Sequence, residues 1–231
     1  MSPGFDVSHS RSAPPSVSVI IRSMDRPTLK EALDSVSRQT LQSIEIVVVH
    51  AKGPDHSTLP DVWDGVPLRE VRSENPLPRS MAANHGLDAA LGDTLIFLDD
   101  DDLFLPDHLE CLLKELSGNP HTRAVYAGVT VKEYEEGQRD PINTYPFNEP
   151  YDRNKLRGRN FIPIHAVLFD QSLVKEGCRF DESLEVFEDW DFWLQIAERS
   201  DFLHLDRISA IYRNQGASGL GKKTNSRILL S

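Results

Sequence analysis

The sequence is poor in cysteine, in long apolar runs and in net positive charge. Its two cysteines, Cys111 and Cys178, form no CxxC pair, which argues against a disulfide framework. No apolar run approaches the ~20 residues that span a bilayer, and the N-terminus has no signal-peptide core. The net charge of −11 argues against nucleic-acid binding, which needs a basic surface. We therefore expect a cytoplasmic protein with reduced thiols, no nucleic-acid partner and at most peripheral membrane contact.

The length and composition predict one globular domain with two poorly ordered ends. Of the 231 residues, 39% are hydrophobic and 26% are charged, which is ordinary for a single α/β domain with a full core. Residues 1–15 are rich in Ser and Pro and have almost nothing to bury, so they predict a disordered lead-in. Residues 214–231 predict a flexible, partly Gly-rich tail. The domain is expected over residues 16–213.

Apolar runs alternate with helical patterns through the first half of this domain. Short β-branched runs at residues 17–21, 44–49 and 94–98 are typical of buried strands. Helical spacing of apolar residues predicts helices from Pro27 to about Val36, from Ser80 to Leu91, and from Pro106 onward. This order predicts a Rossmann-like α/β fold with a mostly parallel sheet flanked by helices. The mixed pattern after residue 120 predicts an addition to the same core.

Four consecutive aspartates, residues 99–102, directly follow the third of these runs. In open α/β sheets, ligands bind beyond the carboxyl ends of the strands, so these carboxylates are candidate site residues. Adjacent carboxylates repel one another unless a cation is bound, and oxygen-rich sites suit Mg²⁺ or Mn²⁺. A solvated acidic turn that caps the helix at Pro106 is the other interpretation. An EF-hand is excluded, because Phe104 occupies the position that needs Gly.

A second acidic group, Glu188 and Asp189, opens a predicted helix whose apolar residues Phe192, Trp193 and Ile196 would pack inward. Carboxylates at a helix start are stabilised by the backbone dipoles, which alone explains them as caps. A carboxylate beside an aromatic wall can also act as a base near neutral pH. The residues themselves leave both interpretations open.

Three segments together resemble family 2 of the GT-A-fold glycosyltransferases. They are residues 15–49, residues 84–109, which contain the four aspartates, and residues 180–197, which contain Glu188 and Asp189. They occur in the family's order within residues 16–213, and it is their combination that makes the resemblance specific. It implies a single GT-A domain, a nucleotide-diphosphate sugar donor and inversion at the anomeric carbon.

The resemblance implies a role for each matching position. Asp99 and Asp101 match the family's aspartate-any-aspartate motif, with Asp101 as the direct ligand of Mn²⁺ or Mg²⁺. Asp189 matches the aspartate that deprotonates the acceptor hydroxyl, and Glu188 is its companion. The residues expected to contact the nucleotide-sugar donor are Arg22, Ser23, Met24, Asp25, His50, Arg79, Asp100 and Asp102. The residues expected at the acceptor are His165 and Trp190.

Two departures from the family pattern affect recognition of the base. The first strand ends in Arg22-Ser-Met-Asp25, without the aromatic residue that relatives stack on the base. The second strand ends in His50-Ala51, where relatives carry acids that read a uracil edge. UDP is therefore not assumed as the donor nucleotide, and Arg22 and His50 are candidates to replace these contacts by stacking or hydrogen bonding.

The function that follows is transfer of a sugar to an acceptor hydroxyl with inversion, in the assembly of cell-surface polysaccharide or glycolipid. The acceptor would be a saccharide or a lipid-linked saccharide, met in the cytoplasm or at the inner face of the membrane. A nucleotidyltransferase is one alternative, although the first strand lacks the Gly-rich phosphate loop it would need. A catalytically silent nucleotide-sugar-binding module is another. A haloacid-type phosphatase fits less well, because the aspartate run lacks the Thr or Val expected after it.

Overall fold

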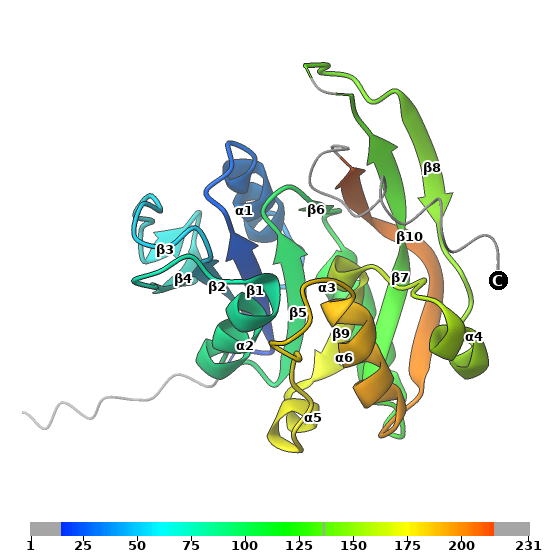
Figure 1. The fold of residues 1–231 in the computed structure, drawn as a ribbon. Coiled ribbons are helices and arrows are strands. Elements are labelled where there is room, and N and C mark those ends of the chain that lie inside the picture. Colours follow the sequence, from blue (N-terminus) through cyan, green and yellow to red (C-terminus); the bar gives the residue numbers. More distant parts are fainter. Residues whose placement is uncertain (1–14, 136, 215–231) are drawn as a thin grey trace, which may run out of the picture.

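The computed structural model describes residues 15–135 and 137–214. In this part of the chain, ten strands form one mixed sheet with helices on both faces (Figure 1). The strands are β1 (Val17–Ser23), β2 (Ile44–His50), β3 (Val62–Trp63), β4 (Val66–Val71), β5 (Thr94–Asp99), β6 (Leu103–Phe104), β7 (Ala124–Glu133), β8 (Asn143–Phe147), β9 (Val167–Asp170) and β10 (Phe202–Asn214). The helices are α1 (Leu29–Ser37), α2 (Arg79–Ala89), α3 (His108–Gly118), α4 (Arg153–Gly158), η1 (Ile164–Ala166), α5 (Gln171–Lys175) and α6 (Glu188–Ala197).

The first half of the chain forms the parallel part of the sheet. Strand β1 lies between β2 and β5 and is parallel to both, and β4 lies parallel to β2 on its other side. Every residue of β1 and β2 is buried. Strands covered on both faces carry continuous apolar runs, which is why the sequence pattern predicts these strands correctly.

The second half extends the same sheet, as predicted, with both antiparallel and parallel pairs. Strand β9 pairs antiparallel with β5, and β7 pairs antiparallel with both β9 and β8. Strand β10 runs parallel to β7, and the short β6 pairs antiparallel with β10. The sheet is therefore mixed, with its parallel order β4-β2-β1-β5 confined to the half that precedes α3.

The helices lie in two groups on the two faces of the sheet. On one face, the Gln39 side chain at the end of α1 bonds the Leu105 carbonyl and the Leu109 amide, which joins α1 to α3. On the other face, Asn84 of α2 bonds the backbone of Phe180, a few residues before α6. Helix α2 ends two residues before the predicted Leu91, and α3 begins at His108 rather than Pro106. The β3–β4 hairpin between β2 and α2 was not predicted.

The register of the sheet places three strand ends side by side. Arg22 lies opposite Asp99, and Ser23 lies opposite His50, so the carboxyl ends of β1, β2 and β5 meet at one edge. The predicted lead-in lies outside the described residues except for Pro15. Of the predicted tail, only Asn214 is described, and it is the last residue of β10. Among the described residues, no helix combines the length and the apolar character needed to cross a membrane.

Candidate active site

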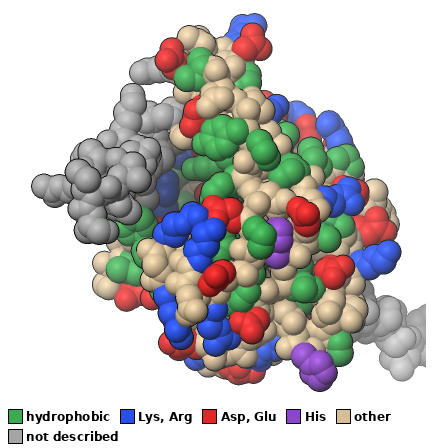
Figure 2. All heavy atoms as spheres, turned by 90° about the vertical axis from the view of Figure 1, so that its right-hand side faces the viewer, with side chains coloured by type: hydrophobic (Ala, Val, Ile, Leu, Met, Phe, Trp, Pro, Cys, Tyr) green, Lys and Arg blue, Asp and Glu red, His purple; other side chains and the backbone are tan. Residues whose placement is uncertain are grey.

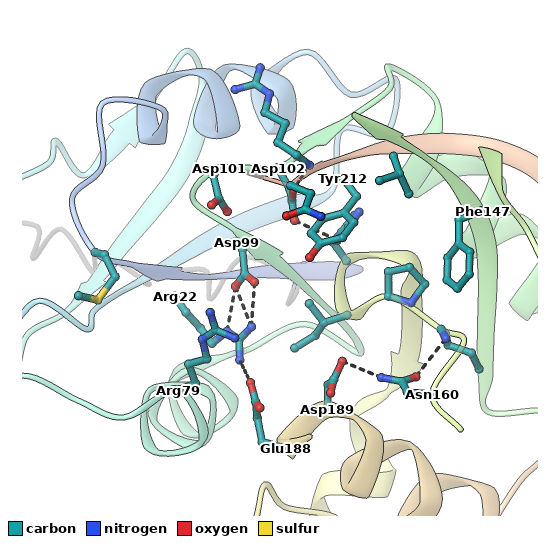
Figure 3. Close-up of a pocket in the computed structure, with 18 of the residues that line it drawn as sticks. Arg22, Arg79, Asp99, Asp101, Asp102, Phe147, Asn160, Glu188, Asp189 and Tyr212 are labelled. Carbon is teal, nitrogen blue, oxygen red and sulfur yellow. Dashed lines mark hydrogen bonds and ion pairs between the residues drawn. The ribbon is translucent and has the colours of Figure 1, made fainter. Parts of the chain in front are cut away.

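A cavity of about 740 Å³ opens at the edge where these strands end. One wall comes from the ends of β1 and β5 and from the start of α2, and the other from β7, β8, residues 160–165 and the start of α6 (Figure 3). A volume in this range is typical of sites that enclose most of a small-molecule ligand. The cavity therefore has room for a donor and the reacting end of an acceptor.

The sequence-predicted residues divide between this cavity and the protein interior behind it. Those that line the cavity are Arg22, Met24, Arg79, Asp99, Asp101, Asp102, His165, Glu188 and Asp189. Those that do not are Ser23, Asp25, His50, Asp100 and Trp190. Both acidic groups singled out from the sequence therefore face one space, although 85 residues lie between Asp102 and Glu188.

Asp99 is bound by a buried arginine. Arg22 Nε and Nη2 donate to Asp99 Oδ1 at 3.0 and 2.8 Å, and Nη2 also donates to Oδ2 at 3.0 Å. The third nitrogen of the same guanidinium, Nη1, donates to Glu188 Oε1 at 3.2 Å (Figure 3). Burial by itself would raise the pKa of Asp99, but Arg22 brings it below its usual value. Arg22 thus joins the aspartate run to the start of α6.

Asp100 and Ser23 have a role beneath the loop that follows β1, not in the cavity wall. The Asp100 side chain is fully buried and accepts hydrogen bonds from the Met24 amide at 2.7 Å and from Ser23 Oγ at 3.2 Å. It also pairs with Arg26. The predicted donor contacts of Asp100 and Ser23 are therefore replaced by contacts that hold this loop. Asp25 lies in the same loop with a positive φ of 58°, and its carboxylate binds Lys52 at 3.0 Å.

Asp101 is the member of the run whose surroundings fit a divalent cation. It lines the cavity, and Arg26 lies 3.7 Å from its carboxylate. Burial and the neighbouring Asp99 raise the pKa of Asp101, and Arg26 offsets them only in part, so a further cation would stabilise its charged form. Within the described residues, no three acidic, His or Cys side chains gather to hold a metal. A cation here would therefore share Asp101 with phosphate oxygens of a ligand, as Mg²⁺ commonly does.

The Asp102 carboxylate is buried and has partners in β10 and η1. Its carboxylate accepts a hydrogen bond from the Arg213 amide at 2.8 Å and lies 3.1 Å from His165 Nδ1. Burial and the charges of Asp99 and Asp101 raise the pKa of Asp102 well above its usual value. Although Asp102 borders the cavity, its contacts tie β10 and η1 to the aspartate run.

The start of α6 places Asp189 opposite the aspartate run. The preceding Phe187 has a left-handed backbone with φ of 63°, which is strained for an aromatic residue. Asp189 Oδ1 accepts from the Trp190 amide at 2.8 Å, and Oδ2 accepts from Asn160 Nδ2 at 2.9 Å. Burial, followed by the charge of Glu188, raises the pKa of Asp189 to about 6. A carboxylate with such a pKa is suited to accept a proton near neutral pH.

The wall beside β1 and β2 lacks an acidic group. It consists of Arg22, Met24, Ala51, Leu77, Arg79 and Ala82. His50 is buried behind it, stacked on His56 with ring centroids 3.8 Å apart. Its Nε2 lies 2.8 Å from Glu70 without the alignment of a hydrogen bond. Burial lowers the pKa of His50. The predicted contact between His50 and the base is therefore not in place, and Ala51 and the exposed Met24 occupy this wall.

The two residues expected at the acceptor are placed differently. His165 lines the cavity, is 1% exposed, and carries an Nε2 with no partner in the described part of the chain. Burial lowers the pKa of His165 to about 4, so the ring is neutral. Trp190 lies outside the cavity lining, and its indole N–H donates to the Leu156 carbonyl at 2.6 Å. The indole thus binds the α4 backbone rather than facing an acceptor.

Several residues of the cavity were not among the predicted site residues. They are Arg26, Tyr145, Phe147, Asn160, Tyr212 and Arg213. Most of them belong to the second half of the sheet, where isolated aromatic and polar residues have no spacing that marks a site. Arg26 lies at the carboxyl end of β1, where ligands bind in open α/β sheets, and this position is its sequence signal.

The acidic pair at α6 and the aspartate run after β5 thus line one cavity, and known proteins with this arrangement can be compared. The model of glycosyl transferase family 2 matches residues 18–178. The chain belongs to this family. The match begins in β1 and includes the aspartate run, but it ends before α6.

Curated relatives in sequence are glycosyltransferases. The uncharacterized glycosyltransferase YwdF of Bacillus subtilis (strain 168) is 29% identical over 199 residues, which cover 85% of this chain and 73% of the relative. The amylovoran biosynthesis glycosyltransferase AmsE of Erwinia amylovora is 27% identical over 186 residues, which cover 78% of this chain and 68% of the relative.

Solved structures share the fold at low sequence identity. S. aureus TarS 1-349 in complex with UDP-GlcNAc matches with a TM-score of 0.67 and 17% identity, over 88% of this chain and 60% of that chain. Mannosyltransferase PcManGT from Pyrobaculum calidifontis, in complex with GDP-Man and Mn²⁺, matches with a TM-score of 0.64 and 18% identity, over 90% of this chain and 59% of that chain. This family 2 chain therefore has the GT-A fold and spans about three fifths of these solved chains.

Proposed function

We propose that this family 2 chain transfers a sugar from a nucleotide-diphosphate donor to an acceptor hydroxyl, with inversion at the anomeric carbon. One observation carries the proposal: Asp189, with its pKa raised to about 6, lines the same cavity as Asp101 and Asp99. A base on one side and a cation-binding carboxylate on the other suit a reaction in which a hydroxyl attacks while a diphosphate departs.

In this mechanism Asp189 accepts the proton of the acceptor hydroxyl as the acceptor oxygen bonds to the anomeric carbon. The bond between that carbon and the donor diphosphate breaks with its electron pair on the phosphate oxygen, and attack from the opposite side inverts the carbon. A divalent cation, Mn²⁺ or Mg²⁺, held by Asp101 and the phosphates would neutralise charge on the departing diphosphate. Arg22 keeps Asp99 and Glu188 in place at 2.8 and 3.2 Å, and orients the start of α6.

The donor base is proposed to be read with altered or relaxed preference. The wall formed by Met24, Ala51 and Leu77 offers apolar surface and backbone groups, and no acidic side chain contributes to it. UDP-GlcNAc is bound by one structural neighbour and GDP-Man by another, so the shared fold is compatible with more than one base. Competition among UDP, dTDP, GDP and CDP for binding measures this preference, and strict selection of UDP would contradict it.

The acceptor is proposed to be a saccharide or a lipid-linked saccharide used in polysaccharide or glycolipid assembly. One relative is named as a glycosyltransferase of amylovoran biosynthesis, which supports an acceptor used in such an assembly. On the face over β8 and α4, apolar side chains gather above a basic group (Figure 2). The exposed apolar residues there include Ile142 and Tyr145, and the basic residues of the α4 region are Arg153, Lys155, Arg157 and Arg159. Because Arg153, Lys155 and Arg159 pair with Asp201 or Glu149, it is the apolar part of this face that we propose for peripheral contact with the cytoplasmic side of a membrane.

The proposal is tested by incubating the protein with nucleotide sugars, Mn²⁺ and saccharide acceptors, and measuring the released nucleotide. Release of a nucleoside diphosphate together with a glycoside of inverted configuration is expected. Release of a sugar 1-phosphate, with the nucleoside monophosphate transferred to the acceptor hydroxyl, would indicate a nucleotidyltransferase instead. Donor binding by calorimetry without turnover of any donor would indicate a silent binding module.

The catalytic role of Asp189 predicts a separation between turnover and stability. Asp189→Asn keeps the shape of the side chain but removes the proton acceptor, so kcat should fall by ~10²–10⁴-fold with the melting temperature retained. Asp191→Asn is a matched control, because Asp191 lies in the same helical turn but not in the cavity lining. If Asp189 were only a cap, its variant would lose about 1 kcal/mol of stability and keep its turnover per folded molecule.

A further inference from the structure

We infer that Asn160 is a positioning residue that fixes the carboxylate of Asp189 in its working orientation and stabilises the charged, proton-accepting form. The inference rests on the proposed role of Asp189 as general base. Asn160 lies in the segment between α4 and η1, which carries no sequence motif and did not enter the sequence predictions. Its side chain points toward Asp189 across the cavity wall (Figure 3).

The orientation of the Asn160 amide is determined by two hydrogen bonds. Its Oδ1 accepts from the Ile162 amide at 3.1 Å, which leaves Nδ2 to donate to Asp189 Oδ2 at 2.9 Å. Because an amide has its acceptor and donor on opposite sides, the bond to Ile162 also selects the group that faces Asp189. The Trp190 amide holds the other carboxylate oxygen, Oδ1, at 2.8 Å. The carboxylate is therefore held at both oxygens and cannot rotate freely.

The helix that carries Asp189 also anchors the segment that carries Asn160. The indole of Trp190 donates to the Leu156 carbonyl at 2.6 Å, and the indole of Trp193 donates to the Ile162 carbonyl at 3.1 Å. Both indoles belong to α6, and their two acceptors lie on either side of Asn160 in the sequence. These contacts set the distance between Asn160 and Asp189 by attaching one segment to the other. They also give Trp190 a role in place of the predicted acceptor contact.

The pKa of Asp189 reflects the groups around it, so a change in this pKa measures the contribution of Asn160. Burial and the adjacent Glu188 favour the protonated carboxyl, whereas the Trp190 amide, Arg22 of β1 and Asn160 favour the carboxylate. The neutral His165 of η1 lines the same cavity, and the segment around Asn160 brings an amide without charge toward the carboxylate. Removing the Asn160 donor therefore deletes one of the three groups that stabilise the base form.

The test is the pH dependence of kcat/KM in Asn160→Ala compared with the wild-type chain. Loss of a hydrogen bond to a charged group should move the acidic limb to higher pH by about one unit, which makes kcat/KM about tenfold lower at pH 5. Asn160→Ser can still donate through a hydroxyl and should restore part of the shift. Asn154→Ala is the control: it removes an exposed amide from the nearby α4, outside the cavity lining, and should leave the acidic limb in place.

A second readout does not depend on turnover. Titration of the Asp189 carboxyl carbon by NMR, assigned by its absence in Asp189→Asn, should show a higher pKa in Asn160→Ala than in the wild type. An unshifted NMR titration and an unshifted acidic limb in Asn160→Ala, with Asp189→Asn still inactive, would overturn the positioning role alone. A higher KM with no change in the acidic limb would likewise overturn it and make Asn160 an acceptor contact. Full turnover of Asp189→Asn would instead refute the proposed function on which the inference rests.

Discussion

At the scale of single residues, neighbours in the sequence have different partners and therefore different roles. Asp101 faces the cavity with Arg26 3.7 Å away, whereas Asp102 holds the Arg213 amide at 2.8 Å and is 1% exposed. Asp100 holds the loop after β1, and Asp99 is bound by Arg22. Four identical side chains thus divide into one that can receive a ligand and three that shape its surroundings.

This division predicts opposite behaviour for two adjacent alanine variants. Asp101→Ala should lower the Mn²⁺-dependent affinity for a nucleoside diphosphate by at least about tenfold, because a direct ligand matters no less than the groups that orient it. Its stability should change little, since Asp101 repels the neighbouring Asp99 and Asp100. Asp102→Ala should leave the Arg213 amide unpaired and cost about 1–3 kcal/mol of stability. Calorimetry with and without EDTA, and thermal melting, measure the two effects.

The wild-type chain is the control for the role of the metal. Its affinity for the diphosphate should fall to the level of Asp101→Ala when EDTA is added, while Asp101→Ala itself should be insensitive to EDTA. Equal binding by the wild-type chain in both conditions would remove the metal from the donor site.

At the scale of elements, α2 packs against the sheet at a glycine. A Cβ added to Gly86 would lie 2.2 Å from Cγ2 of Ile20 in β1 and 3.3 Å from Cγ2 of Val49 in β2. Both neighbours are fully buried side chains, so neither can move into solvent. The close approach brings the start of α2, and with it Arg79, next to the end of β1.

Gly86→Ala should therefore destabilise the protein, although alanine favours helices. Overpacking in a dense core typically costs about 1–3 kcal/mol, which exceeds the ~0.5–1 kcal/mol gained in helix propensity. The control is Gly118→Ala in the last turn of α3, where nothing lies within 4 Å of the added Cβ. This control should raise the melting temperature slightly. A stabilised Gly86→Ala would mean that α2 can move away from β1 without loss.

The elements also show what the sequence could and could not predict. Strands β1, β2 and β5 are buried on both faces, so their apolar runs predict them within one or two residues of their ends. Strand β8 reads NTYPF and is mostly exposed. Strands β3 and β6 have two residues each, and β6 depends on pairing with the distant β10. No local pattern marks such strands. The same limit applies to the site: Asp101 and Asp189 stand in motifs, whereas Asn160 acts only through a tertiary contact.

At the scale of the whole molecule, the cavity of this acidic chain combines arginines with carboxylates. The chain carries a net charge of −11, and four arginines line the cavity, namely Arg22, Arg26, Arg79 and Arg213. They lie among the acidic groups of the aspartate run and α6. A diphosphate would otherwise be repelled by an acidic protein, so local positive charge at the cavity is a condition for donor binding.

The buried histidines predict how the stability of the whole fold depends on pH. His108 is fully buried at the start of α3; its Nε2 donates to the His165 carbonyl at 3.2 Å, and its Nδ1 accepts from Ser209 Oγ at 2.7 Å. Burial, followed by the nearby His165, lowers the pKa of His108 from 6.5 to about 3. The native state therefore stays unprotonated where the unfolded chain binds a proton. Stability from this residue is complete above pH 6.5 and is lost as the pH falls toward about 3.

Carboxyl groups with a raised pKa change the stability with pH in the opposite direction. The pH dependence of the wild-type melting temperature therefore does not report the contribution of His108 alone. The native state holds the proton of Asp189 up to about pH 6, which favours folding as the pH falls from about 6 toward the usual value of 3.8. A variant is therefore needed. His108→Gln removes the titrating group while keeping an amide to donate to the His165 carbonyl, and the exposed His121→Gln controls for the loss of a histidine as such.

Between pH 6 and 4, the melting temperature of His108→Gln should fall less steeply with decreasing pH than that of the wild type. One proton taken up only by the unfolded chain is worth about 1.4 kcal/mol per pH unit, or roughly 3–5 °C per pH unit for a chain of this size. The variant will be less stable near pH 7, because a packed imidazole is lost, so the slopes must be compared and not the melting temperatures. Parallel melting curves for variant and wild type across this range would show that His108 is protonated in the folded protein. The bond from Nε2 to η1 would then not depend on a neutral ring, and the acid sensitivity of the fold would have to come from His165, whose pKa is lowered to about 4.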